Sequence, residues 1–191
     1  KRLGTEKLGD IKYKDLNGDG KITLDGDRQI IGKNFPSWTG GLSFSVRYKN
    51  FDLSGLFQGA FDVDGYFTSE AAYAFFNGTT ALKRHLDRWT PENHDATYPR
   101  ITRTDQTNFT TSSFWLQDAS YVRLKNLTLG YTLPKDWMTK LGVTNAKLFL
   151  SGENLFTITG LDGGIDPEEA SERGWSYGNV KKISVGVRLS F

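Results

Sequence analysis

The chain has 191 residues and a formal net charge of +2, with 37% hydrophobic residues, 14% aromatic residues, 21 glycines and no cysteine. This composition is typical of many short strands and disfavours packed helices, while the mixed charges, which form no basic stripe, argue against nucleic-acid binding. The lack of cysteine excludes disulfides and thiolate metal sites, and the lack of an apolar run of about 18 residues excludes a transmembrane helix but not membrane-spanning strands.

The first 37 residues are polar and rich in Asp-Gly and Asn-Gly pairs. They predict an extended loop region with little regular structure, followed by a strand region over residues 38–191. The chain begins at Lys1 in what reads as the middle of a loop, so we expect a fragment or a processed product.

Strand signals begin at Trp38. Residues 42–48 alternate apolar and polar side chains, residues 49–50 fit a tight turn, and residues 51–67 alternate again. The pattern predicts a long antiparallel hairpin with a two-residue link. Its length suits strands that cross a bilayer, which need about 9–11 residues.

Residues 68–113 break the strand pattern and are rich in Asn, Thr, Asp and Pro. We predict a long loop with one short helix over residues 80–89, ended by Pro91. A loop of about 45 residues is uncommon in a compact soluble domain and is usually functional.

The rest of the chain returns to strands. The alternating pattern shifts by one residue near Lys125 and Asn126, which predicts a β-bulge. A helical turn is expected over residues 136–141. The remaining strands are predicted over residues 115–133, 146–158 and 178–191, separated by a short link at 134–145 and a long loop at 159–176.

The predicted links alternate between short and long along the chain. This asymmetry is typical of outer-membrane barrels, whose periplasmic turns are tight and whose extracellular loops are long. Five strands cannot close a barrel, and open edges are prohibitive in lipid, so we expect further strands to complete it. Aromatic residues should form two interfacial girdles, an outer one at Trp38, Tyr66, Phe67, Trp115, Trp175 and Tyr177 and an inner one at Tyr48, Phe51, Tyr131, Trp137 and Phe191.

Several motifs resemble one family over nearly the whole chain. The longest and most specific is SFWLQDASYVRLKNLTLGYTLP at residues 113–134. The sequence is similar to the C-terminal region of SusC/RagA-type TonB-dependent transporters, large outer-membrane proteins of Bacteroidetes. The other matching stretches are GDIKYKDLNGDGKIT at 9–23, IG at 31–32 with Pro36, YPR at 98–100, SGENLFT at 151–157 and VGVRLSF at 185–191.

The resemblance implies an all-β fold in which this chain supplies the last five or so antiparallel strands of a 22-strand barrel with a plug. It also implies a multi-pass protein of the Gram-negative outer membrane that imports oligosaccharides or peptides. The implied partners are a SusD-like surface lipoprotein, the barrel assembly machinery, and the TonB complex acting through an N-terminal region that this sequence lacks.

One local motif fits a calcium loop. Side-chain oxygens at positions 1, 3 and 5, a glycine at 6 and a backbone carbonyl at 7 suit Ca²⁺. Position 12 is Gly26 where an acid is expected, and no flanking helices are predicted. The alternative is an Asx- and Gly-rich surface turn. The candidate ligands are Asp15, Asn17, Asp19, Lys21, Thr23 and Asp27.

Other residues have a functional and a structural interpretation. Five aromatic residues could stack on sugar rings at the outer mouth, or could serve as girdle and packing residues: Trp89, Phe109, Phe114, Trp115 and Trp175. His85 and His94 could form a metal or acid–base pair, although a solvated loop is the simpler interpretation. Phe191, at the end of an alternating strand, resembles an outer-membrane assembly signal, the alternative being an ordinary edge strand.

Two other functions compete with import. A soluble carbohydrate-binding β-sandwich stapled by calcium would need turn signals about every 8–12 residues, which the long spacing between strands and loops disfavours. A hydrolase would need a carboxylate pair or a Ser/His/acid set on rigid elements. The candidates lie only in predicted loops, so we expect no enzyme activity. A separate loop cluster of carboxylates could contact substrate or calcium, although solvation is the simpler interpretation: Asp162, Asp166, Glu168 and Glu169.

Overall fold

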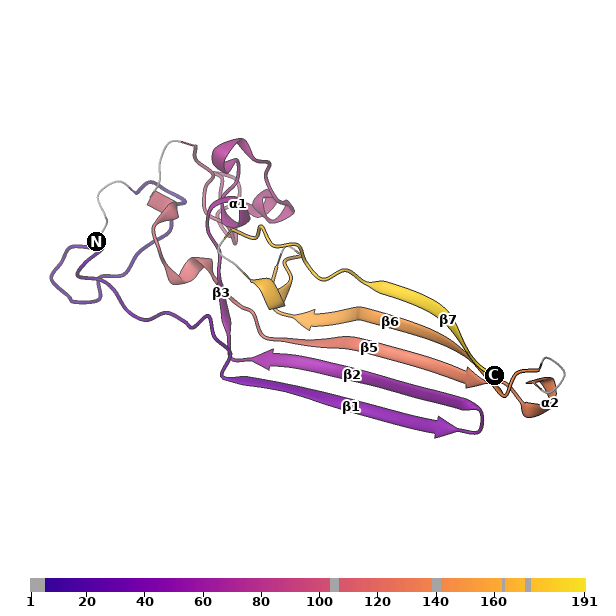
Figure 1. Ribbon diagram of the computed structural model, residues 1–191. Helices are drawn as coiled ribbons and strands as arrows, with labels where there is room; N and C mark the ends of the chain where they lie inside the picture. The colour runs from indigo at the N-terminus through magenta and orange to yellow at the C-terminus, as the bar shows by residue number, and fades with distance from the viewer. Residues whose placement is uncertain (1–5, 104–106, 139–141, 163, 171–172) are drawn as a thin grey trace. The chain divides into compact units, whose positions relative to one another are not determined.

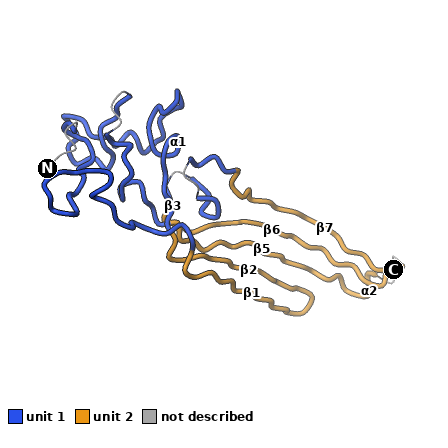
Figure 2. The backbone as a smooth tube through the Cα atoms, turned by 60° about the vertical axis from the view of Figure 1, so that its left-hand side comes forward, with its two compact units in different colours: residues 1–35, 64–118, 161–176 blue, residues 36–63, 119–160, 177–191 orange. Residues whose placement is uncertain are grey.

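The computed structural model describes residues 6–103, 107–138, 142–162, 164–170 and 173–191 (Figure 1). The chain divides into two compact units, each built from three separate stretches of sequence (Figure 2). Unit 1 holds residues 1–35, 64–118 and 161–176, and unit 2 holds residues 36–63, 119–160 and 177–191. The N-terminal segment is therefore not a separate region, because it packs together with the two long segments that were predicted as loops.

Unit 2 is built around one antiparallel sheet with the strand order β1-β2-β5-β6-β7. Within the described residues, the outer edges of β1 and β7 have no further strand beside them. The strands are β1 Trp38–Tyr48, β2 Phe51–Phe61, β5 Tyr121–Thr132, β6 Asn145–Thr159 and β7 Lys182–Ser190, and the helix α2 covers Lys135–Met138 between β5 and β6.

The hairpin and the bulge confirm two local predictions. β1 ends at Tyr48 and β2 begins at Phe51, so the link has two residues, and the first of them, Lys49, has a left-handed φ of 52°. The register between β5 and β6 shifts between Leu124 and Asn126, where the alternation of side chains changes phase.

The two faces of the sheet differ sharply in polarity. Residues that pair across strands point to the same face, so the registers place apolar side chains together on one side. That apolar face is open: Leu42 is 66% exposed, Leu150 47% and Val185 79%. The opposite face carries polar and charged side chains from all five strands, among them Ser45, Asp52, Thr128, Ser151 and Arg188.

Aromatic rings occupy the hairpin end of the sheet, as the inner girdle prediction requires. Phe51 and Tyr131 pair across β2 and β5 with ring centroids 4.6 Å apart, and Tyr48 is exposed. At the other end Trp38 is also exposed. The outer girdle is wrong for Phe67 and Trp115, because both side chains are buried inside unit 1.

Unit 1 has its own aromatic core, to which residues 68–113, predicted as a long loop, contribute short helical segments and buried side chains. The buried residues are Phe67, Ala71, Ala72, Tyr73 and Trp115. The Tyr73 ring meets the edge of Trp115 at 5.0 Å. The elements of unit 1 are short: β3 Asp64–Tyr66 paired with β4 Leu116–Asp118, α1 Ser69–Ala72, and 3-10 turns at Phe76–Gly78, Lys83–Asp87, Thr107–Phe109, Ser113–Trp115 and Pro167–Glu169.

Several predicted element bounds need correction. The strand expected over residues 115–133 begins only at Tyr121, because Ser113–Trp115 is a 3-10 turn and Leu116–Asp118 pairs with β3 instead. β2 stops at Phe61 because Asp62 adopts a left-handed φ of 59°, and the chain then enters β3. The helix expected over residues 80–89 is a 3-10 turn at Lys83–Asp87. The last strand begins at Lys182, four residues later than predicted. Residues 139–141 of the predicted helical turn lie outside the described residues.

No helix in the described part of the chain is long and apolar enough to span a membrane.

Candidate functional site

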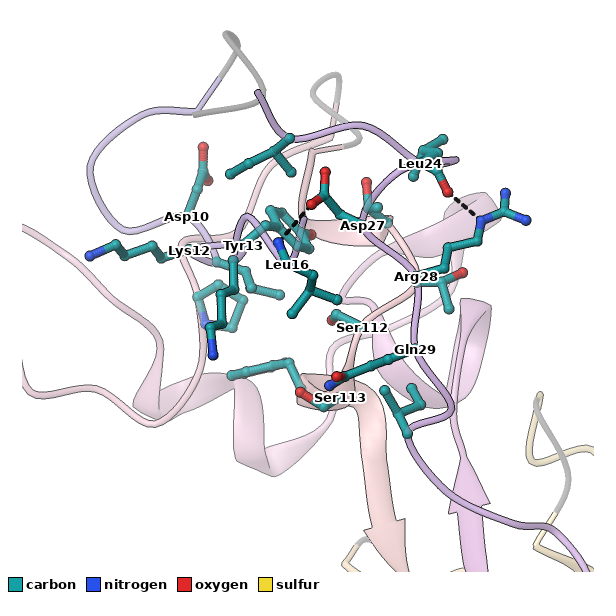
Figure 3. Close-up of a pocket in the computed structure, with 18 of the residues that line it drawn as sticks. Asp10, Lys12, Tyr13, Leu16, Leu24, Asp27, Arg28, Gln29, Ser112 and Ser113 are labelled. Atoms are coloured by element: carbon teal, nitrogen blue, oxygen red, sulfur yellow. Dashed lines mark hydrogen bonds between the residues drawn. The ribbon is translucent and has the colours of Figure 1, made fainter. Parts of the chain in front are cut away.

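A cavity in unit 1 has a volume of about 1040 Å³ (Figure 3). Segments that are far apart in the sequence form its walls. Aromatic and aliphatic side chains alternate there with hydroxyls and a few charges. The wall-forming stretches are 9–14, 22–24, 27–29, 96–99 and 110–114, together with Leu16, Ile31 and Trp89.

A buried carboxylate fixes one wall of the cavity. The side chain of Asp10 is fully buried, and Arg100 Nη2 donates to its Oδ2 at 3.0 Å while Arg100 Nε lies 2.8 Å from its Oδ1. Asn108 Nδ2 donates to the same carboxylate at 2.9 Å, and Asn108 Oδ1 accepts the Ile11 N–H at 2.8 Å. These contacts join the N-terminal segment to residues 100–108.

Gly9 permits a close approach between the backbone and the Trp89 indole. Gly9 has a φ of +86°, and a Cβ at this position would lie 2.3 Å from Trp89 Cδ2. Gly18 has a similar φ of +77°, but open space surrounds the position of its absent Cβ.

We therefore expect Gly9→Ala to destabilise unit 1 more than Gly18→Ala does. Both substitutions place a side chain at positive φ, at a cost of about 1–2 kcal/mol. Only Gly9→Ala also displaces an indole, which should add about 1–3 kcal/mol. Unfolding free energies of the two variants measure the difference, and equal values would show that the Trp89 contact does not constrain the backbone.

The segment after Trp89 is folded back by a carboxylate. Asp87 accepts hydrogen bonds from the hydroxyl and the N–H of Thr97 and from Asn93 Nδ2. These hydrogen bonds, led by the Thr97 hydroxyl, hold the pKa of Asp87 below its usual value. The turn places the His94 ring parallel to Trp89, with centroids 5.7 Å apart.

A second carboxylate closes the 15–27 loop. Asp27 Oδ1 accepts the Leu16 N–H at 2.7 Å (Figure 3). Its Oδ2 accepts the Thr23 N–H, also at 2.7 Å. These hydrogen bonds, with the one from Thr23 contributing most, lower the pKa of Asp27. The arrangement was not predicted, because the sequence shows no signal that Asp27 would bind backbone N–H groups.

The lowered pKa of Asp27 predicts how the loop responds to acid. Because the folded-state pKa lies below the unfolded value, the stabilisation is complete above the usual Asp range and is lost as the pH falls through the folded pKa. We expect the Leu16 and Thr23 amides to stay protected from hydrogen exchange at pH 5. Their protection should decrease once the pH is lower than about 4. Hydrogen exchange at a series of pH values, corrected for intrinsic rates, measures this protection. Asp27→Asn should remove its pH dependence. An unchanged pH profile in that variant would show that Asp27 does not cause it.

The predicted calcium ligands lie in this same loop, where side-chain oxygens among them accept hydrogen bonds from the backbone. The Asp15 carboxylate accepts the N–H groups of Gly18 and Gly20, and Asp19 accepts that of Lys21. The described residues contain no cluster of three or more His, Cys, Asp or Glu side chains that could hold a metal ion. The oxygen donors suit Ca²⁺ by type, but in this geometry they point at backbone N–H groups.

One of the two histidines departs from the solvated loop that the sequence suggested, whereas His94 is exposed. His85 is buried, its Nδ1 accepts the Leu82 N–H at 2.9 Å, and its Nε2 lies 3.1 Å from the Ala72 carbonyl oxygen. Burial lowers the pKa of His85, which favours the neutral ring. Both ring nitrogens are therefore used in packing the core, and His94 stacks on Trp89 instead.

Burial also shifts the pKa values of two tyrosines that line the cavity. It raises the pKa of Tyr13 to about 12 and raises the pKa of Tyr98 further. The Tyr13 hydroxyl donates to the Thr107 carbonyl at 2.6 Å, and the Tyr98 hydroxyl donates to the Ala72 carbonyl. Both rings act as neutral walls with fixed hydrogen bonds.

The predicted cargo-contact aromatics fall into two groups. Trp115 is buried, with its Nε1 donating to the Asn108 carbonyl, and Phe109 stacks on Tyr73 at 4.0 Å. Trp89 lines the cavity, and Trp175 is 67% exposed with the Arg173 guanidinium 4.7 Å above its ring. Phe114, another of the predicted cargo-contact aromatics, also lines the cavity. Sequence reasoning missed the lining residues Gln29 and Ser112, because only the fold brings their segments together.

Phe191 is 88% exposed and follows the end of β7. Its role as an assembly signal stays a prediction.

No protein-family model matches the chain. By sequence the chain is similar to TonB-dependent receptor P26 of Formosa agariphila (34% identical over 96% of this chain), TonB-dependent receptor P3 of the same organism (32% over 98%) and TonB-dependent receptor SusC of Bacteroides thetaiotaomicron (28% over 94%). The chain spans about a fifth of the length of each, 20%, 20% and 17% in that order.

The fold leads to the same group of proteins. The chain is similar to the RagAB peptide transporter, with a TM-score of 0.71 and 26% identity, and to the RagAB peptide importer in the open-open state, with a TM-score of 0.69 and 28% identity. Each match covers 90% of this chain and 19% of the other chain. The strands described above therefore match part of a larger barrel.

Proposed function

This chain is related by sequence and by fold to a barrel portion of SusC/RagA-type TonB-dependent receptors, and from that premise we propose that it forms part of an outer-membrane importer. In this proposal unit 2 is a segment of the barrel wall, and unit 1 is the part that meets cargo. The relatives found are receptors and importers, and we infer that this chain likewise carries no catalytic site.

The observation that carries the proposal is the two-faced sheet of unit 2. β1 and β2 have 11 residues each and β5 has 12, which is enough to cross a hydrocarbon core at a tilt. One face exposes a continuous apolar surface, which suits lipid. A soluble sandwich would cover that face with a second sheet, and the described residues provide none.

The links suggest an orientation. Lys49 and Asn50 make one tight turn, and residues 133–144 make the other short link at the same end of the sheet. The segments of unit 1 leave the sheet from the opposite end, where Trp38 pairs with Phe61. By the usual asymmetry of outer-membrane barrels, we place the tight links in the periplasm and unit 1 outside.

The family relationship also suggests partners. We propose that a SusD-like lipoprotein covers the full-length receptor, that the TonB complex supplies energy, and that the barrel assembly machinery inserts it. The solved structures that this chain resembles are of a peptide importer. Its sequence relatives, SusC among them, are named as TonB-dependent receptors, and these names specify no cargo. The cargo is therefore proposed as an oligosaccharide or a peptide that contacts the aromatic- and hydroxyl-lined cavity of unit 1.

Uptake in cells tests this proposal. Fluorescent oligosaccharides and peptides of matched size would be given to a strain with the full-length receptor, to a deletion strain and to a strain without TonB. Import proceeds, on this proposal, only in the first strain. Uptake of every oligomer at the same rate in all three strains would contradict the proposed function.

A calcium site is proposed in the 15–27 loop as a separate matter. Binding would require the oxygens of Asp15, Asn17 and Asp19 to turn from backbone N–H groups toward the ion. Extracellular sites of this kind have dissociation constants of about 10⁻⁴–10⁻³ M. Calorimetric titration of Ca²⁺ into the receptor should show heat that Asp15→Asn removes and that Asp95→Asn, an exposed control, leaves intact; identical traces would contradict calcium binding here.

A further inference from the structure

The strands of unit 2 carry a surplus of positive charge. They hold six of the chain's 24 basic residues and only two of its 22 acidic residues, so outside the strands acidic residues outnumber basic ones. The excess is therefore a property of the sheet and not of the whole chain. The charged residues of the strands are Arg47, Asp52, Arg123, Lys125, Lys147, Glu153, Lys182 and Arg188.

Cross-strand pairs neutralise both acids on the polar face. Lys147 Nζ lies 2.7 Å from Asp52 Oδ2, reaching across Gly130, where a side chain would collide with both partners. Lys182 Nζ lies 3.7 Å from Glu153 Oε2. The acids of this face are thus already matched by lysines.

The same face also carries Arg47, Arg123 and Arg188. The registers place Arg47 opposite Asp52 and Arg188 opposite Lys147, so both flank the Asp52–Lys147 pair. Both are exposed and form no ion pair within the described residues. Arg123 is buried on this face and donates from Nε to the Thr157 hydroxyl.

The cavity of unit 1, considered separately, also has more positive than negative residues in its lining. Its two acids are engaged, Asp10 with Arg100 and Asp27 with backbone N–H groups. Exposed Lys12 and Lys14 line the cavity and form no ion pair within the described residues. Arg28 also lines it, with only the exposed Asp25 nearby at 3.4 Å, and Figure 3 shows Lys12 and Arg28 extending outward on opposite sides.

The lining also contains an unused hydroxyl. The Oγ of Ser112 is buried and has no hydrogen-bond partner among the residues that the structure describes. A hydroxyl can donate a hydrogen bond to a ligand oxygen. The Ser112 hydroxyl is therefore a candidate hydrogen-bond donor to a ligand in the cavity that Lys12 and Lys14 also line.

We propose that the cargo is an anionic oligomer that carries carboxylate groups. The inference rests on the proposed import function. Clefts lined by one sign of charge concentrate ligands of the opposite sign, and the guanidinium of arginine binds carboxylates and similar oxyanions with two parallel hydrogen bonds. Two units described independently present the same unmatched charge, one along the polar face and one around the cavity.

Binding to the purified full-length receptor tests the charge of the cargo. The probes are oligogalacturonate and its fully methyl-esterified form, which has the same length and no charge. Oligoglutamate and oligoglutamine of equal length give the same comparison for peptides and tell the two sources apart. The acidic member of one pair should bind at least ten times more tightly at low salt, and its advantage should shrink as salt screens the charges.

Variants assign the effect to these residues. Lys12→Gln with Lys14→Gln, and Arg47→Gln with Arg188→Gln, should each reduce the preference for the acidic probe several-fold, while Lys83→Gln, an exposed control away from the cavity, should not. Equal binding of the acidic and neutral probes, or binding of neither pair, overturns the proposal. The double variant with Arg47→Gln and Arg188→Gln could lower the melting temperature of the receptor and leave probe binding unchanged. The two arginines would then contact other parts of the protein and not the cargo, and the proposal would fail for the polar face.

The two proposals fail in different ways. Receptor-dependent uptake that ignores the charge of the oligomer would overturn the anionic cargo and leave import intact. Uptake that is independent of the receptor for every oligomer would overturn import itself.

Discussion

Leu150→Arg is expected to block stable insertion of the full-length receptor into the outer membrane. Leu150 lies midway along β6 on the apolar face, paired with Leu129 and Val185. If this face contacts lipid, an arginine near the bilayer midplane costs about 2–4 kcal/mol. The receptor should then be depleted from the outer-membrane fraction, and the remainder should unfold at lower urea concentration in lipid vesicles.

The neighbouring residue provides a matched control. Ser151 pairs with Thr128 and Ser184 on the polar face, so Ser151→Arg places the same side chain one position away on the other side of the sheet. We expect normal membrane levels for this variant. Equal loss of both variants would mean that the two faces do not differ in environment, and loss of Ser151→Arg alone would reverse the assignment of the faces.

Asp10→Ala is expected to disrupt unit 1 without affecting the sheet. The substitution removes the carboxylate that binds Arg100 and Asn108 and leaves a largely buried guanidinium without its partner. Breaking a buried ion pair on one side costs about 3–5 kcal/mol. Hydrogen exchange in peptides covering residues 6–14 and 107–115 should therefore rise strongly, while peptides from β1 and β2 stay protected.

Asp95→Ala is the control for that substitution, because Asp95 is exposed in the same unit and has no hydrogen bond or ion pair within the described residues. Its effect should stay within about 0.5 kcal/mol. If Asp10→Ala behaves like Asp95→Ala, the Asp10 contacts do not hold the cavity wall together. A collapse of protection in both units would instead show that they fold as one.

The sheet was predictable because its signals are local. The alternation in residues 42–48 and 51–61 reports a strand with two different faces, and Lys49-Asn50 reports the turn between them. The bulge near Lys125 was visible as a change of phase in the same alternation. A strand that separates lipid from a polar side must repeat every two residues, so its sequence records its environment.

Unit 1 was not predictable for the opposite reason. Its core forms when residues 67–73 meet Trp115, and its cavity wall forms when Asp10 meets Arg100 and Asn108. No periodic pattern marks contacts between short irregular segments. Phe109 and Trp115 were therefore interpreted as girdle or cargo residues, although both pack against Tyr73.

Collisional quenching along β1 tests the central claim most directly. The chain has no cysteine, so single cysteines can be placed at residues 42–47 of an otherwise cysteine-free full-length receptor and labelled with a fluorophore. Brominated lipids should quench labels at Leu42, Phe44 and Val46, while a water-soluble quencher should reach Ser43, Ser45 and Arg47. Quenching of all six by the aqueous agent, with no alternation, would contradict a membrane-spanning sheet.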